Sequence, residues 1–173
     1  MVVPEHGAAP CAAGQEEPMT SIHVEREAAA PAARVWTVMT DVPRIPDVLS
    51  SVRAVERLDD GDGFGVGTRW RETRIVMGRE STEEMRVTDL DPGRSCTIGA
   101  EGRGSRYVSV LAVEPLDVDR SRVSMAFEVV PTTAAGRVGA ATVGRLLRGT
   151  MRKGLTQDLE DIARAAERAS RRS

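Results

Sequence analysis

Residues 138–170 read VGAATVGRLLRGTMRKGLTQDLEDIARAAERAS, and this stretch decides the fold. It contains no proline, and apolar side chains recur along it at spacings of three and four, which predicts one long amphipathic helix. Glycines interrupt its first half, and each costs about 1 kcal/mol of helix stability relative to alanine. Another interaction must therefore compensate for the lower helix stability of this half. The repeating apolar residues are Ala140, Val143, Leu147, Met151, Leu155, Leu159, Ile162 and Ala166.

The segments before this helix alternate between strand and turn patterns, and they supply the layer that covers it. Residues 21–28 predict a strand, and residues 33–41 predict a short helix that follows Pro31. A second short helical piece is expected at residues 45–49. This order predicts an α+β fold in which the long helix buries Leu147, Met151, Leu155, Leu159 and Ile162 against an antiparallel sheet. The six further strands are expected at residues 51–58, 68–77, 79–90, 95–101, 105–116 and 121–130.

Particular residues accompany this order of elements. They are IHVEREAAAPAARVWTVMTDVPRIPDVL at residues 22–49, GVGTRWRE at 65–72, VTDLDPGR at 87–94 and EPL at 114–116. In these residues the chain resembles the START-like or Bet v 1-like superfamily, also called SRPBCC or polyketide cyclase/dehydrase and lipid-transport proteins. The resemblance implies a helix-grip fold, in which a seven-stranded antiparallel sheet wraps around the long C-terminal helix beside a hydrophobic cavity. It also implies binding of lipids, sterols, polyketides, hormones or quinones, with cyclase activity in a minority of members.

The composition is that of one globular domain. The chain has 173 residues, of which 40% are hydrophobic and 29% charged, and its net charge of -2 gives no reason to expect nucleic-acid binding. It has no apolar run long enough for a membrane span and no secretory signal pattern, so we expect a cytoplasmic protein, as a monomer or homodimer. We expect a disordered tail at residues 1–19 and the helix-grip domain at residues 20–170. Whether residues 1–18 belong to the native protein is left open.

Cysteine and histidine are too sparse for a metal site or a nucleophilic triad. Cys11 lies in the leader and Cys96 in a strand pattern, so a disulfide between them is not expected. His6 lies in the leader, and His23 has no second type of ligand at metal spacing. We therefore expect no metal and no cofactor.

The candidate site begins in residues 67–87, GTRWRETRIVMGRESTEEMRV, which predict a β-hairpin with a two-residue turn at Gly78 and Arg79. One face is plainly solvent, whereas the other mixes apolar and charged side chains. Arg74 then stands opposite Glu83 and can pair with it. The pair is either a partly exposed ion pair without a ligand role or a cavity-lining pair that meets a polar group of a ligand. The expected pairs are Trp70 with Val87, Glu72 with Met85, Arg74 with Glu83 and Val76 with Ser81.

Other candidate ligand contacts lie on later elements. In residues 121–130 the apolar alternation is expected to face the helix, as core or as ligand contacts. The inward face of residues 105–116 is left open, so Tyr107 either holds a ligand oxygen or makes a surface or structural hydrogen bond. The glycine-rich residues 61–67 lack phosphate-loop spacing and are expected to form a mobile loop carrying Phe64 as a candidate lid. The candidate ligand-binding residues are Trp70, Glu72, Arg74, Glu83, Met85, Tyr107, Met125, Phe127, Leu147 and Met151.

Three functions fit these features. The leading one is a carrier or sensor that binds a small, mostly hydrophobic molecule, such as a lipid or polyketide, between sheet and helix. The alternative is an aromatase/cyclase-like enzyme acting on a polyketide, in which Arg74, Glu72 and Tyr107 polarise carbonyls or move protons. The third is a protein-interaction module without a ligand. An open cavity with inward acid, base and tyrosine would favour the enzyme, and a cavity filled by side chains would favour the interaction module.

Overall fold

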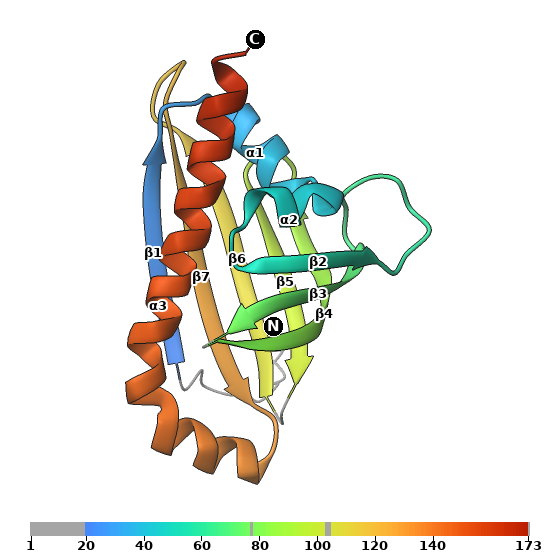
Figure 1. Cartoon of the computed structure of the whole chain (residues 1–173), viewed down its shortest axis with the longest axis vertical. Helices are drawn as coiled ribbons and strands as arrows, with labels where there is room; N and C mark the ends of the chain where they lie inside the picture. Colours follow the sequence, from blue (N-terminus) through green and yellow to red (C-terminus); the bar gives the residue numbers. More distant parts are fainter. Residues whose placement is uncertain (1–19, 77, 103–104, 173) are drawn as a thin grey trace, which may run out of the picture.

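The computed structural model describes residues 20–76, 78–102 and 105–172, with the side chains of residues 20, 131 and 134–147 left aside. The predicted tail therefore lies outside the described residues. The long helix α3, Ala134–Ser170, lies against a seven-stranded antiparallel sheet (Figure 1). The predicted α+β helix-grip architecture is confirmed. The strands are β1 (Thr20–Ala28), β2 (Val52–Arg57), β3 (Arg69–Val76), β4 (Arg79–Asp91), β5 (Ser95–Gly102), β6 (Ser105–Pro115) and β7 (Ser121–Pro131).

Three short helical elements lie between β1 and β2. They are the helix α1 (Ala32–Thr40), the 3-10 turn η1 (Val42–Arg44) and the helix α2 (Ile45–Val48). The two α-helices lie where the sequence predicts them. Helix α3 begins at Ala134, before the predicted start at residue 138, and alanine is a strong helix former.

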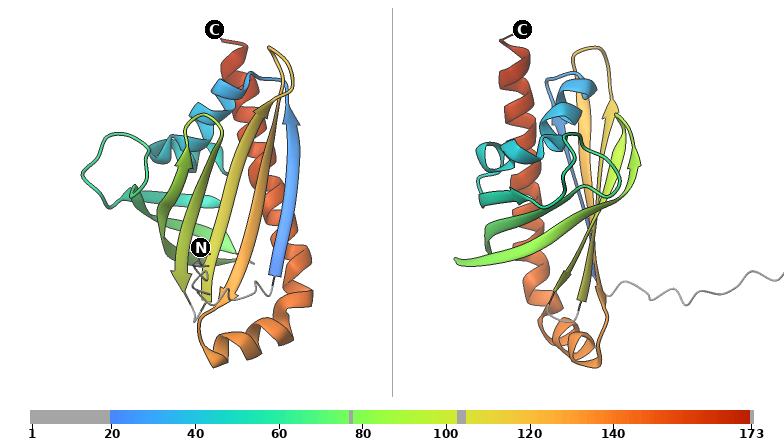
Figure 2. Two further views of the ribbon diagram at one scale, coloured as in Figure 1. Left: turned by 180° about the vertical axis from the view of Figure 1, so that it is seen from behind. Right: turned by 90° about the vertical axis from the view of Figure 1, so that its right-hand side faces the viewer.

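The sheet is strongly curved, and this curvature creates the inner face on which α3 lies. Its strand order is β1-β7-β6-β5-β4-β3-β2, so the first strand pairs with the last. Irregular pairing occurs between Val52 and Ala54 in β2 and between Val87 and Asp89 in β4. Such bulges bend a strand and increase its twist. Strands β2 to β4 consequently curl away from the plane of β1, β7 and β6 (Figure 2).

Two hydrophobic clusters lie on the inner face. The larger one joins α1, β1, β6 and β7 to the C-terminal half of α3, and the smaller one is built on Val42, Trp70 and Val87. In α3, Leu159 and Ile162 are buried as predicted, whereas Met151 and Leu155 are partly buried against the larger cluster. Leu147, the fifth predicted contact, lies outside the described side chains.

The inward face of β6 and β7 is now defined. Leu111 and Val113 of β6 are buried, whereas Val110 is 38% exposed. The alternation that contains Tyr107 therefore faces inward. On β7, Val123 and Met125 are buried, as predicted.

We expect Leu159→Ala to lower the free energy of unfolding by about 2 to 5 kcal/mol, because its fully buried side chain would leave a cavity. Leu155→Ala should cost less, since Leu155 is only partly buried. Urea denaturation monitored by circular dichroism measures both values. Equal costs, or a negligible cost at Leu159, would contradict this packing of α3.

Candidate functional site

Strands β3 and β4 form the predicted hairpin, but the predicted register is wrong. Arg79 pairs with Val76 and is the first residue of β4, so it is not part of the turn. Gly78 precedes it with a φ of +77°, and the sequence rule that places glycine first in the turn does not apply here. The predicted pairs are displaced by two residues, which leaves each side chain on its predicted face. The observed pairs are Trp70 with Met85, Glu72 with Glu83, Arg74 with Ser81 and Val76 with Arg79.

The two faces of the hairpin differ in burial as the alternation predicts. On the inner face, Trp70 is 2% exposed and Glu72 is 4% exposed. On the outer face, Arg71 forms ion pairs with Glu56 at 2.7 Å and Glu84 at 3.3 Å, and these side chains are well exposed. The charged residues of the inner face are therefore enclosed, and their partners determine what this face can do.

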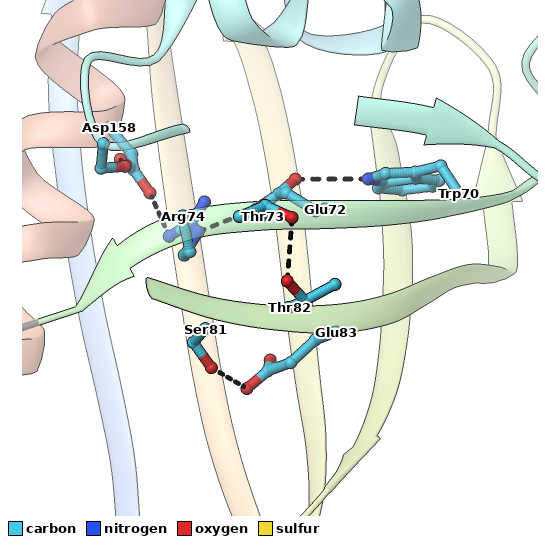
Figure 3. A network of polar contacts seen from close by, with 9 residues as sticks. Trp70, Glu72, Thr73, Arg74, Ser81, Thr82, Glu83 and Asp158 are labelled. Atoms are coloured by element: carbon cyan, nitrogen blue, oxygen red, sulfur yellow. Dashed lines mark hydrogen bonds and ion pairs between the residues drawn. The ribbon is translucent and has the colours of Figure 1, made fainter. Parts of the chain in front are cut away.

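Arg74 is the centre of a polar network on the inner face (Figure 3). Its Nε donates a hydrogen bond to Glu72 Oε1 at 2.8 Å, and its Nη1 donates to Asp158 Oδ2 of α3 at 3.2 Å. Trp70 Nε1 donates to the second oxygen of Glu72 at 3.2 Å. Ser51 Oγ donates to the second oxygen of Asp158 at 3.0 Å. One guanidinium thus joins β3 to the long helix.

The expected ion pair between Arg74 and Glu83 is replaced by this network. The observed register places Ser81 opposite Arg74, and Ser81 Oγ lies 3.5 Å from Glu83 Oε1. The nearest carboxylate on the same face of β3 is Glu72, two residues before Arg74. Asp158 reaches Arg74 from across the molecule because α3 lies over this face.

Asp158 and Asp161 of α3 are buried carboxylates that the sequence analysis missed. They are 3% and 8% exposed. Asp161 Oδ2 accepts hydrogen bonds from the backbone nitrogen of Ser50 at 2.9 Å and from its Oγ at 2.6 Å. Asp158 follows Leu155 by three residues and directly precedes Leu159, so it lies on the apolar face of the predicted helix. A carboxylate at a position within the apolar repeat of this helix could have identified Asp158 from the sequence.

The buried groups of this network have shifted pKa values. Burial raises the pKa of Asp158, although Arg74 and Ser51 oppose the shift. Burial would also raise the pKa of Asp161, but hydrogen bonds from Ser50 and Gln157 outweigh it and lower that pKa. Burial would lower the pKa of Arg74, but the charges of Glu72 and Asp158 raise it. The guanidinium therefore remains charged, while Asp158 keeps its proton to a higher pH than an exposed carboxyl.

The other predicted ligand contacts lie on β4, β6, β7 and α3. Tyr107 of β6 and Phe127 of β7 are stacked, with ring centroids 6.1 Å apart and an angle of 19° between the rings. Met125 is buried in the larger cluster, which Met151 borders, and Met85 borders the smaller one. The structure therefore groups Trp70, Glu72 and Arg74 in one network and places the two aromatic rings across β4 and β5 from it.

The described residues contain no group of three or more histidine, cysteine or acidic side chains that could hold a metal ion. Cys96 is a free, buried cysteine, and burial raises the pKa of its thiol to about 11. His23 is exposed and lies 3.8 Å from Glu25. In the same part of the chain, no helix is both long and apolar enough to span a membrane.

The family profile for polyketide cyclase/dehydrase and lipid transport matches residues 19–167. This chain belongs to that family. The match spans the whole described sheet and nearly all of α3. No curated protein sequence matches the chain.

Solved structures with this fold include enzymes. The Zhui aromatase/cyclase from Streptomyces sp. R1128 is 26% identical, with a TM-score of 0.72, over 87% of this chain and 96% of that one. TTHA0849 from Thermus thermophilus is 19% identical, with a TM-score of 0.69, over 87% and 99% of the chains. Norcoclaurine synthase from Thalictrum flavum is 21% identical, with a TM-score of 0.56, over 82% and 94%. The last two show only a shared fold.

Substituting the two aspartates of α3 should change the pH dependence of stability in opposite directions. The lowered pKa of Asp161 stabilises the fold above its ordinary pKa, and this contribution is lost as the pH falls. Asp161→Asn should therefore flatten the acid decline of the unfolding free energy. The raised pKa of Asp158 has the opposite effect, because the free energy of unfolding falls as the pH rises above 3.8, the ordinary pKa of this carboxyl. Asp158→Asn should therefore remove this fall in the free energy of unfolding.

Urea denaturation of both variants and the parent protein at pH values from about 3 to 7 measures these slopes. Asp47→Asn, at a side chain that is 70% exposed, is the control for removing a surface carboxylate. Slopes that change in the same direction at Asp158 and Asp161 would contradict the environments described for the two carboxylates.

Proposed function

We propose that this protein binds a small, mostly apolar molecule with at least one oxygen atom between the sheet and α3, as a carrier or sensor. The observation that carries the proposal is the position of Arg74. Its side chain is 27% exposed and is held by Glu72 and Asp158, each of whose side chains is only 4% exposed. Membership of a family named for polyketide chemistry and lipid transport supports an apolar ligand.

The geometry of Arg74 suits an oxygen acceptor. A guanidinium has five N–H donors, and the two ion pairs use one at Nε and one at Nη1. The two carboxylates fix the plane of the group, while its partial exposure keeps it accessible. A carbonyl, phenol or carboxylate oxygen could then bind without further ordering of the side chain.

Burying charged groups is rarely favoured by stability alone, because well-packed apolar residues often serve as well. Trp70, Glu72, Arg74 and Asp158 nevertheless form a network in which described buried side-chain atoms all have partners. A ligand with a polar group offers a reason to keep a cation in this position. Trp70 and Met85 in the adjoining cluster supply the apolar surface for the rest of such a ligand.

An aromatase/cyclase-like activity on a polyketide is the second candidate. Its support is the 26% identity to the Zhui aromatase/cyclase and the raised pKa of Asp158 beside Arg74. Arg74 would polarise a carbonyl oxygen, and Asp158 would supply or take up a proton. Tyr107, which was expected to share this task, lies on β6, outside the network described around Arg74. A protein-interaction module, a cytoplasmic location and a monomeric or homodimeric state stay predictions.

Arg74→Lys tests the proposal while keeping a positive charge between the two carboxylates. Dihydroxyanthraquinone, an aromatic polyketide-type probe, should bind the parent protein and bind this variant about tenfold or more weakly. A lysine ammonium lacks the planar fork of five donors, and a lost hydrogen bond to a charged group is worth about 1.5 to 3 kcal/mol. Isothermal titration calorimetry measures the Kd. Arg71→Lys on the outer face is the matched control and should leave the Kd unchanged.

Equal losses of affinity at Arg71 and Arg74 would remove Arg74 from the site. Native mass spectrometry of the purified protein would then identify any co-purifying compound directly. Conversion of a poly-β-keto substrate mimic by the parent protein, lost in Asp158→Asn while the probe still binds, would favour the enzyme over the carrier.

A further inference from the structure

The side chain of Phe64 occupies a position shared by the two hydrophobic clusters. It lies in the loop that leaves the end of β2 and returns at the start of β3 (Figure 1). Among the described residues, two partly buried side chains, Phe64 and Ile98, pack against both clusters. Ile98 belongs to the ladder of β5, whereas Phe64 comes from a loop and is directed into the interior without a strand to place it there.

The clusters that meet at Phe64 contain most of the apolar residues assigned to the ligand. Trp70 and Met85 belong to the smaller cluster or border it. Met125 belongs to the larger cluster, which Met151 borders. The ring of Phe64 therefore lies at the junction between two groups of candidate ligand contacts.

Hydrogen bonds hold the loop that carries Phe64. Asp59 Oδ1 accepts from the backbone nitrogen of Arg69 at 2.6 Å, and Asp59 Oδ2 accepts from Arg57 Nη2 at 2.8 Å and Nε at 3.1 Å. Arg57 Nη2 also donates to the carbonyl oxygen of Gly63 at 2.6 Å, directly before Phe64. Beyond Phe64, the backbone nitrogen of Gly65 donates to Thr68 Oγ1 at 3.0 Å. The backbone is thus tied on both sides of the ring.

We propose that Phe64 is a specificity-determining residue that limits the size of the apolar molecule accepted between the sheet and α3. This inference rests on the proposed function. A ring fixed between the two clusters occupies volume that a larger ligand needs, and the anchored loop prevents the ring from simply moving aside. Removing the ring would open space where the two clusters meet.

The test compares the Kd values of naphthol and dihydroxyanthraquinone, which differ in ring number, for the parent protein and for Phe64→Ala. The ratio of the two Kd values should shift toward the larger probe by roughly tenfold or more, the size expected when a pocket gains the volume of several carbon atoms. Phe64→Leu should shift the ratio less. Val66→Ala, in the same loop at a residue that is 64% exposed, should leave the ratio unchanged.

The ratio of the two Kd values separates a change in specificity from partial unfolding, because partial unfolding lowers the apparent binding of both probes together. Equal weakening of both probes in Phe64→Ala would show that the ring only stabilises the loop, and it would overturn the specificity role while leaving the proposed function intact. If Phe64→Ala fails to fold, the ratio for Phe64→Leu decides. Failure of the parent protein to bind either probe would overturn the proposed function and this inference together.

Discussion

The structure depends on one buried electrostatic contact, the pair of carboxylates that hold Arg74. Glu72 belongs to the same strand, but Asp158 belongs to α3, 84 residues later in the chain. Removing one member of a buried ion pair leaves an uncompensated charge and costs about 3 to 5 kcal/mol. The contact therefore ties α3 to β3, in the curled half of the sheet that also carries the smaller cluster. Asp161 adds a second anchor, to Ser50, at the start of the same half.

The C-terminal turns of α3 and the turns around Met151 and Leu155 make different contacts. Its C-terminal turns present Leu159, Ile162 and Ala166 to the larger cluster, where these side chains are buried. On the same turns, Asp158 and Asp161 point to the β2 and β3 side, where polar atoms of Ser50, Ser51 and Arg74 satisfy them. Earlier in the helix, Met151 and Leu155 are only partly buried. The helix thus grips the sheet firmly at one end, and the proposed ligand would lie beside its middle.

The fold could be predicted because its signals are local. Turn chemistry and alternation located the strands, and the apolar repeat located α3, since each depends on neighbouring residues. The face of the hairpin that carries Trp70 and Arg74 was also predictable, because a register error of two residues preserves the faces. The partner of Arg74 was not predictable in this way. Its identity depends on the turn geometry at Gly78 and on the packing of α3 across the sheet, and both are set by tertiary structure.

A carrier and a cyclase would both need a fixed positive charge at this site, so the geometry of Arg74 supports both functions. A cation fixed by two carboxylates is preorganised, so it can hold a ligand oxygen without a further entropic cost for orienting its own side chain. The same preorganisation would stabilise negative charge that develops on a carbonyl oxygen in a transition state. The two functions differ in whether Asp158 must exchange a proton during the reaction. Asp158 has one oxygen bonded to Ser51 and the other to Arg74, so a proton it releases would have to leave through groups already committed to structure. This commitment argues for binding as the primary role, with catalysis requiring that a ligand displace one of those bonds.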